Sequence, residues 1–167
     1  MQALTEVYPV PITYEDIEGE AKGYFHTTDH RIAIQEGMSQ SQTVKTAIHE
    51  VVHAKLHDWE RNQDIDAVLD KDRNTKEVEA ESVAYTVCQH FGIDTSDYSF
   101  GYIAGWSSDR DMKELKSSLD TIRKTASELI TGIEDRLAEL QKDRAVEQEQ
   151  NKESILLIQN DDVTQYS

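Results

Sequence analysis

The feature that most constrains this chain is the segment His49-Glu50-Val51-Val52-His53, because its spacing has a chemical meaning only on a helix. Positions four apart on an α-helix lie about 40° from each other around the axis and roughly 6 Å along it, so both imidazoles can reach one metal ion from the same side. Glu50 then lies beside the pair, placed to handle a proton. Zinc hydrolases use this spacing: two His bind the ion and the Glu is the general base for a water at the metal.

The residues around this segment predict the helix that it needs. Apolar side chains recur at spacings of three and four and would form one buried stripe, made of Val44, Ile48, Val51, Val52, Leu56 and Trp59. Ser39 or Ser41 can cap the start of the helix. The three histidines His49, His53 and His57 follow one flank of the stripe. The alternative is that they are partly buried helix residues without a ligand.

A tetrahedral zinc site with an open position for water needs a third protein ligand. His57 is a poor candidate, because three ligands in line on one unbroken helix cannot surround an ion. Residues 76–85 predict a second helix with its own apolar stripe. At 100° per residue, Glu77 lies closest to that stripe, so we expect it to be the ligand, with Glu79 and Glu81 as alternatives.

Glu81 has a second expected role. It follows Glu77 by one turn on the same flank, where it can accept the free N–H of a liganding His and so fix the tautomer of that ring. The small side chains of Ala80 and Ala84 would let the two helices approach closely. The alternative for the three glutamates is a solvated acidic helix face.

Several blocks of the sequence, taken in order, resemble one family. They are residues 23–25 (Gly-Tyr-Phe), 32–38 (Ile-Ala-Ile-Gln-Glu-Gly-Met), 46–57 around the His pair, 77–85 around the glutamates, and 91–96 (Phe-Gly-Ile-Asp-Thr-Ser). Over roughly residues 8–145 the chain resembles the metallopeptidase domain of ArdC-type antirestriction proteins and of LtrC-like proteins of conjugative elements. More distantly it is similar to the ImmA/IrrE peptidases.

This resemblance implies a zincin-like fold, a bound Zn²⁺ and a protein or peptide substrate. In that broad group a Glu followed four residues later by Asp, Asn or Glu supplies the third ligand and its neighbour, and the pattern falls on Glu77 and Glu81. The ImmA/IrrE peptidases differ in that they usually have Gly before the second His, and Asn at the position of Glu81. Full-length ArdC-type proteins also carry an N-terminal single-stranded-DNA-binding domain, and nothing in this sequence corresponds to it.

Composition restricts the expected partners. A formal net charge of −16 would repel a phosphate backbone, so we expect no nucleic-acid site on this chain. The single cysteine, Cys88, excludes an internal disulfide framework and fits a reducing compartment. No segment resembles a signal peptide, and no apolar run approaches the length that a bilayer needs. We therefore expect a cytoplasmic domain without a membrane partner.

The first 38 residues predict a small sheet. Residues 10–14 lead in, and strand-like runs at 24–26 and 31–34, separated by a polar turn, predict a hairpin. A strand beside the active-site helix could bind an extended substrate through backbone hydrogen bonds.

Residues 96–106 are rich in aromatic side chains. Tyr98 and Tyr102 are one turn apart, and either phenol could hydrogen-bond the oxyanion that forms when a carbonyl is attacked. The alternative is that the aromatic side chains of this segment, Trp106 included, simply pack against the core.

From Met112 to Leu140 apolar residues are spaced by threes and fours, which predicts one long amphipathic helix. It could lie on the surface of its own domain, or pair with another copy or another domain. Residues 142–153 have the composition of a polar linker, and 155–158 resemble the start of a strand. We therefore expect the domain to cover residues 1–145, and residues 146–167 to be a linker and the start of a truncated following unit.

These features together predict an α+β, zincin-like metallopeptidase domain. Its small N-terminal β-sheet packs on the active-site helix, followed by a ligand helix and the long C-terminal helix. The expected function is a zinc-dependent peptidase of a mobile-element antirestriction or conjugative-transfer protein. The alternative is a non-catalytic zinc-binding interaction module of a DNA-handling protein whose DNA-binding domain is absent.

Overall fold

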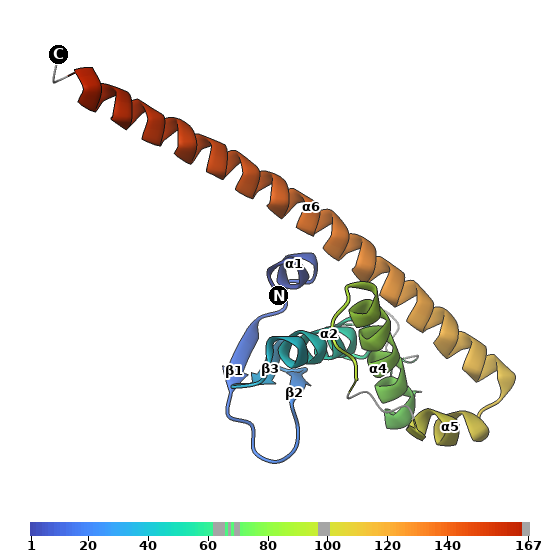
Figure 1. Ribbon diagram of the computed structural model, residues 1–167. Coiled ribbons are helices and arrows are strands. Elements are labelled where there is room, and N and C mark those ends of the chain that lie inside the picture. Colours follow the sequence, from blue (N-terminus) through green and yellow to red (C-terminus); the bar gives the residue numbers. More distant parts are fainter. Residues whose placement is uncertain (62–65, 67, 69–70, 97–100, 165–167) are drawn as a thin grey trace.

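The computed structural model describes residues 1–61, 66, 68, 71–96 and 101–164 (Figure 1). The fold is α+β, with a three-stranded sheet and a majority of helices. In chain order its elements are α1 (Gln2–Val7), β1 (Ile12–Glu15), β2 (Gly23–His26), β3 (Arg31–Gln35), α2 (Gln40–Leu56), α4 (Arg73–His90), α5 (Gly101–Ser108) and α6 (Met112–Thr164).

The sheet has β3 at its centre. The strand order is β1-β3-β2, with β1 parallel and β2 antiparallel to β3. The predicted hairpin is therefore confirmed: residues 27–30 join β2 to β3, and His30 adopts a positive φ of 47° in that turn. The middle residues of β3 are fully buried, whereas β2 forms one edge of the sheet.

Helix α2 lies between the sheet and α4 (Figure 1). It begins after Ser39, whose hydroxyl accepts a hydrogen bond from the Gln42 backbone N–H at 3.2 Å. Its predicted apolar stripe is buried, with Ile48 and Val51 at most 2% exposed. Trp59 does not belong to this stripe, because the helix ends at Leu56, and Trp59 is 46% exposed.

Helix α4 packs against α2 on one side and α6 on the other. It begins after Asp72, whose carboxylate accepts the Thr75 backbone N–H at 2.7 Å and so caps the helix. Ala80 and Ala84 are fully buried, as is Cys88. Small side chains at the first two positions allow the close approach of helices that the sequence predicts.

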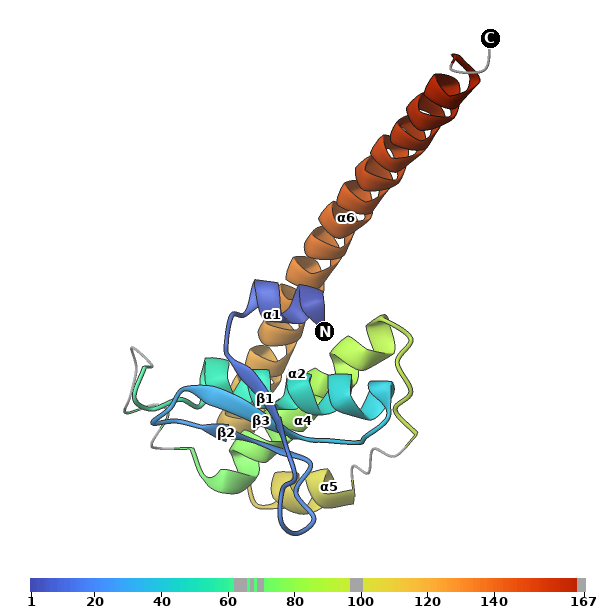
Figure 2. The same cartoon turned by 90° about the vertical axis from the view of Figure 1, so that its left-hand side faces the viewer.

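Helix α1 was not predicted; it is a six-residue helix that packs across α6 (Figure 2). Ala3 and Leu4 are buried there, and Glu6 forms an ion pair with Arg136. A Cβ on Gly132 would lie 2.8 Å from Val7 Cγ1, so the glycine leaves room for the crossing. The beginning of the chain is thereby fixed to the long helix.

The expected strand at residues 155–158 is wrong, since α6 continues to Thr164, and the polar segment at 142–153 is part of the same helix. The physical reason is composition: no Gly or Pro follows Gly132, and residues 142–154 are rich in Glu, Gln, Lys and Arg, which favour a helix. Where a following unit would begin stays a prediction.

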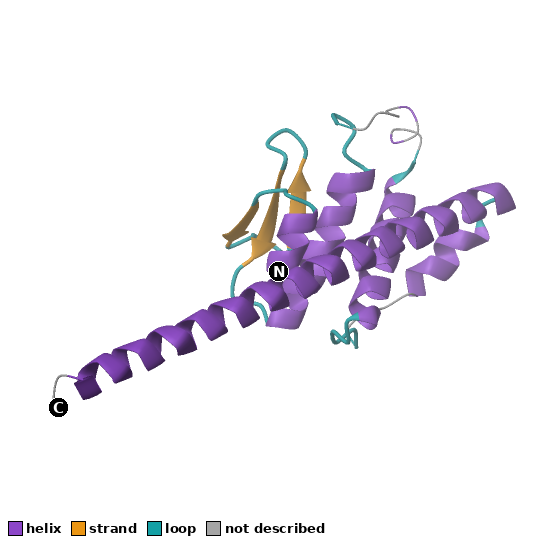
Figure 3. Cartoon of the chain, turned by 90° about the horizontal axis from the view of Figure 1, so that it is seen from above, coloured by secondary structure: helices purple, strands orange, loops and turns teal. Residues whose placement is uncertain are grey.

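Only part of α6 lies on the domain. Ala126, Leu129 and Ile133 are buried against it, while Leu119 is 64% exposed. The rest of the helix projects past the other elements, as Figures 2 and 3 show, and residues 155–158 in this projecting part are exposed. The first part thus packs on its own domain, one of the two arrangements expected. No helix in the described part of the chain combines the length and the apolar character needed to cross a membrane.

Candidate metal centre

Two imidazoles from α2 form one side of the candidate centre. Because they are four residues apart on a continuous helix, the rings of His49 and His53 stand next to each other, with centroids 4.8 Å apart. Their Nε2 atoms lie 3.1 Å from each other. Both side chains are partly accessible, at 18% and 16% exposure. The helix therefore presents two nitrogen donors side by side to solvent.

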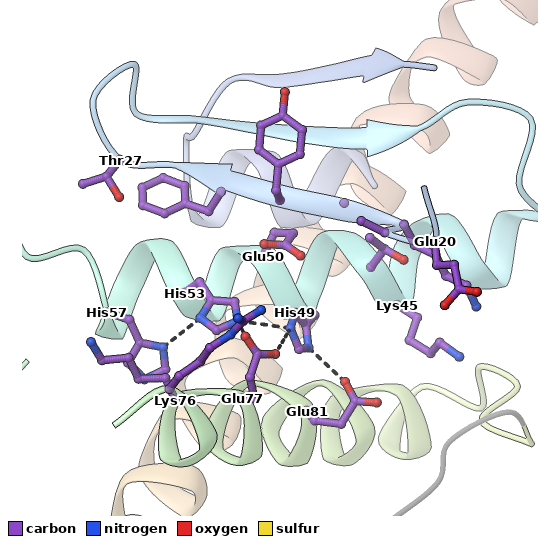
Figure 4. Close-up of a pocket in the computed structure, with 17 residues that line it drawn as sticks. Glu20, Thr27, Lys45, His49, Glu50, His53, His57, Lys76, Glu77 and Glu81 are labelled. Atoms are coloured by element: carbon purple, nitrogen blue, oxygen red, sulfur yellow. Dashed lines mark hydrogen bonds and ion pairs between the residues drawn. The ribbon is translucent and has the colours of Figure 1, made fainter. Parts of the chain in front are cut away.

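Helix α4 supplies the third group. Glu77 Oε2 lies 3.4 Å from His49 Nε2, and Glu77 Oε1 lies 3.6 Å from His53 Nε2 (Figure 4). Within the described residues these three side chains form the one group of His, Cys, Asp or Glu with ligand atoms all within 4.8 Å of one another. The structure thus brings together the three residues that the sequence analysis singled out.

The donor set fits a zinc ion. Bonds of about 2.0–2.2 Å in a tetrahedral arrangement put neighbouring ligand atoms about 3.3–3.5 Å apart. The two Nε2 atoms are 3.1 Å apart, and the Glu77 carboxylate reaches them with its two different oxygens, at 3.4 and 3.6 Å, so the separations are close to that range. Two neutral imidazoles and one carboxylate are also a donor set of catalytic zinc sites, which leave the fourth position open.

Electrostatics ties the three groups together. Burial lowers the pKa of His49, but its hydrogen bonds to Glu77 and Glu81 outweigh that effect and raise the pKa to about 10. Hydrogen bonds from His49 and His53 hold the pKa of the Glu77 carboxyl well below its usual range. Without a metal, the cluster is therefore an imidazolium paired with a carboxylate, and a metal ion would take the place of the proton on His49.

Glu50 lies between α2 and the edge strand β2. It is 7% exposed, and its burial raises the pKa of the carboxyl in spite of the nearby imidazoles of His49 and His53. The backbone N–H of Phe25, on β2, donates a hydrogen bond to it. A carboxyl with a raised pKa is a better proton acceptor than an ordinary one.

The predicted contact of Glu81 is present in the geometry. Its Oε2 lies 2.9 Å from His49 Nδ1, so this carboxylate faces the ring nitrogen that Glu77 does not contact (Figure 4). Glu79, the other alternative ligand, points elsewhere. It is fully buried, and its oxygens contact His57, Lys71 and Ser118 instead of the cluster.

Sequence reasoning missed what His57 does. Its Nδ1 lies 2.9 Å from His53 Nδ1, and its Nε2 lies 3.0 Å from Glu79 Oε2. The only signal in the sequence was the recurrence of His one turn after His53, on the same flank. The burial of Glu79 had no signal, because a Glu on a helix flank usually faces solvent.

The centre opens into a cleft of about 840 Å³. Its walls come from β2, α2 and α4, and residues from all three line it, including Gly23, Tyr24, Phe25, Lys45, His49, Glu50, His53, Lys76 and Glu77.

The two tyrosines expected as oxyanion donors stay a prediction. Tyr98 lies outside the described residues, and Tyr102 lies in α5, where its side chain is not described. Trp106 is half-buried, and its indole N–H donates to Thr75 Oγ1 on α4 at 2.9 Å.

Comparison with known proteins found one family and one curated relative at significant similarity. Residues 5–97 match the family Peptidase_M78, the IrrE N-terminal-like domain. Over 126 residues the chain is 36% identical to an uncharacterized protein of Bacillus anthracis, a segment that covers 75% of this chain and 20% of that protein. The chain thus spans about a fifth of the length of this relative. No solved structure matches the chain. Since the family match covers more than half of the sequence, this chain belongs to the Peptidase_M78 family of IrrE N-terminal-like domains.

Proposed function

We propose that this domain is a zinc-dependent, zincin-like peptidase in which His49, His53 and Glu77 hold the ion and Glu50 is the general base. One observation carries the proposal: the cluster of three donors faces an open cleft and has a buried carboxyl of raised pKa beside it. A purely structural zinc site is usually closed by four protein ligands and needs no such neighbour.

The residues of the chain have distinct parts in this chemistry. Bound zinc would supply a Lewis acid that polarises the scissile carbonyl and lowers the pKa of water. Glu50 takes the proton from the attacking water and then passes it to the leaving amine. Its burial between β2 and α2 suits this exchange, because a raised pKa brings the two protonation states closer in free energy. Glu81 accepts the N–H of His49 and orients that ring.

Strand β2 is the proposed binding edge for the substrate. It is the outer strand of the sheet on the side of α2, and Gly23, Tyr24 and Phe25 line the cleft. An extended peptide can pair with such an edge through backbone hydrogen bonds, which would place its carbonyl groups beside the metal centre. The substrate class is therefore an unstructured protein segment or peptide.

We further infer that the domain belongs to a larger antirestriction or conjugative-transfer protein of the cytoplasm. The resemblance to ArdC-type and LtrC-like proteins supports this, as does a relative about five times longer than the matched segment. The net charge of −16 implies that any contact with DNA is made by another domain.

The test is the variant Glu50→Gln, which removes the proton acceptor but keeps the shape of the side chain. We expect the zinc-loaded variant to retain its metal and to lose cleavage of an unfolded protein substrate by at least about 100-fold. Glu147→Gln, an exposed position on the projecting part of α6, is the matched control and should cleave like the parent. Equal cleavage by Glu50→Gln would refute the base. Zinc binding without cleavage by the parent would favour the non-catalytic interaction module.

A further inference from the structure

His57 connects the candidate metal centre to a buried carboxylate. It is the C-cap residue directly after α2, and its ring lies one turn beyond His53 (Figure 4). Its two nitrogens contact different partners: Nδ1 faces His53 Nδ1 at 2.9 Å, and Nε2 faces Glu79 Oε2 at 3.0 Å. The side chains of His57 and Glu79 are 4% and 0% exposed, so water does not compete for these contacts.

Glu79 is stabilised as a carboxylate. Lys71 Nζ lies 2.9 and 3.0 Å from its two oxygens, and the hydroxyl of Ser118, on α6, donates to Oε1 at 3.0 Å. A buried carboxylate needs such partners, because removing it from water without them is very unfavourable. An ionised carboxylate can only accept hydrogen bonds. The nitrogen of His57 that faces it must therefore carry a hydrogen.

This requirement determines the hydrogen positions back to the metal centre. The Nδ1 atoms of His57 and His53 are 2.9 Å apart, so one of them donates a hydrogen bond and the other accepts it. A neutral imidazole has one N–H, and with the hydrogen on Nε2 its Nδ1 accepts. His53 Nδ1 must then donate. The lone pair of His53 is left on Nε2, the atom that faces His49 and Glu77.

We propose that His57 is a positioning residue: together with Glu79 it holds His53 in the tautomer and ring orientation that present Nε2 to zinc. This inference rests on the proposed function, since it takes His53 as a ligand. His57 itself contacts no metal in this account. Its role for His53 corresponds to that of Glu81 for His49, with one more imidazole between the ligand and the carboxylate.

The test measures zinc affinity of the full chain by competition with a chromophoric chelator. We expect His57→Leu to weaken zinc binding by about 10–100-fold, the usual effect of losing a group that orients a ligand. In His57→Asn the side-chain carbonyl oxygen takes the place of Nδ1 and can still accept a hydrogen bond from His53. This variant should therefore recover most of the zinc affinity. His90→Leu removes a different His–Glu pair, with Glu134, and should bind like the parent.

A second measurement needs no variant. Nitrogen-15 NMR of the parent chain should find the hydrogen of His57 on Nε2, both with and without zinc. A hydrogen on Nδ1 would overturn the proposal, and so would equal zinc affinity of His57→Leu in a parent that binds zinc. Those results leave the peptidase proposal standing. A parent that binds no zinc would overturn both.

Discussion

Gly23 lets β2 approach α2 closely, so Gly23→Ala tests the packing that surrounds Glu50. A Cβ at this position would lie 2.6 Å from Thr46 Cγ2, 3.0 Å from the Ala33 carbonyl oxygen and 3.4 Å from Glu50 Cγ. Non-bonded carbon atoms prefer separations of about 3.5–4.0 Å, so the strand must move from the helix by roughly 1 Å. Thr46 is buried and β-branched, and its methyl group cannot turn away without strain.

Overpacking of this kind costs about 1–3 kcal/mol. We expect Gly23→Ala to lower the free energy of unfolding by that amount, measured by urea denaturation with far-UV circular dichroism. The displaced strand also moves the Phe25 N–H from the Glu50 carboxylate, so peptide cleavage by the folded variant should fall as well.

Gly105→Ala is the control for this experiment. Apart from its own turn of α5, no heavy atom of the described residues lies within 4 Å of a Cβ at that position. We expect its stability to be unchanged or increased by up to about 1 kcal/mol, the difference in helix propensity. If Gly23→Ala is as stable and as active as the parent, β2 does not pack on α2 as closely as we describe.

Three other predictions follow from the site and the helices. Zinc binding to the metal-free chain at pH 7 should release at least one proton, because the pKa of His49 is about 10. Titration calorimetry in buffers of different ionisation enthalpy measures this release, and its absence would contradict a protonated His49 paired with Glu77. Asp72→Ala should reduce stability by about 1 kcal/mol by uncapping α4, and Asp72→Asn by much less. The hydrogen bond from the Thr75 backbone lowers the pKa of Asp72, so the charge-dependent part of its contribution is present above its ordinary pKa near 3.8 and is lost as pH falls through the lower folded value. An Asp72→Ala deficit that does not shrink in acid contradicts this part of the contribution. A chain shortened to residues 1–145 should keep its thermal midpoint and zinc affinity, because residues 146–160 are all exposed. A clear loss of either would show that the projecting part of α6 stabilises the domain.

The helices that carry the site could be predicted because local pattern and tertiary packing agree there. The stripe that includes Ile48 and Val51 is both periodic and buried, and the cap at Ser39 is a short-range contact. The side on which Glu77 lies follows from helix geometry alone. These are features that a few neighbouring residues determine.

Other features depend on contacts distant in the sequence. The parallel pairing of β1 with β3, the crossing of α1 over Gly132, and the burial of Glu79 against Ser118 join segments with no shared local pattern. The end of α6 was missed for a different reason. Polar composition at residues 142–153 suits both a linker and a solvated helix, and the absence of Gly and Pro was the decisive signal.

The most direct test of the account is X-ray absorption at the zinc edge, together with metal content per chain, for the parent and His53→Ala. We predict one zinc in the parent with only nitrogen and oxygen neighbours at about 2.0–2.2 Å, two of them imidazole, and loss of the metal in the variant. A parent without stoichiometric zinc, or a variant that keeps both its zinc and two imidazole neighbours, would contradict the proposed centre.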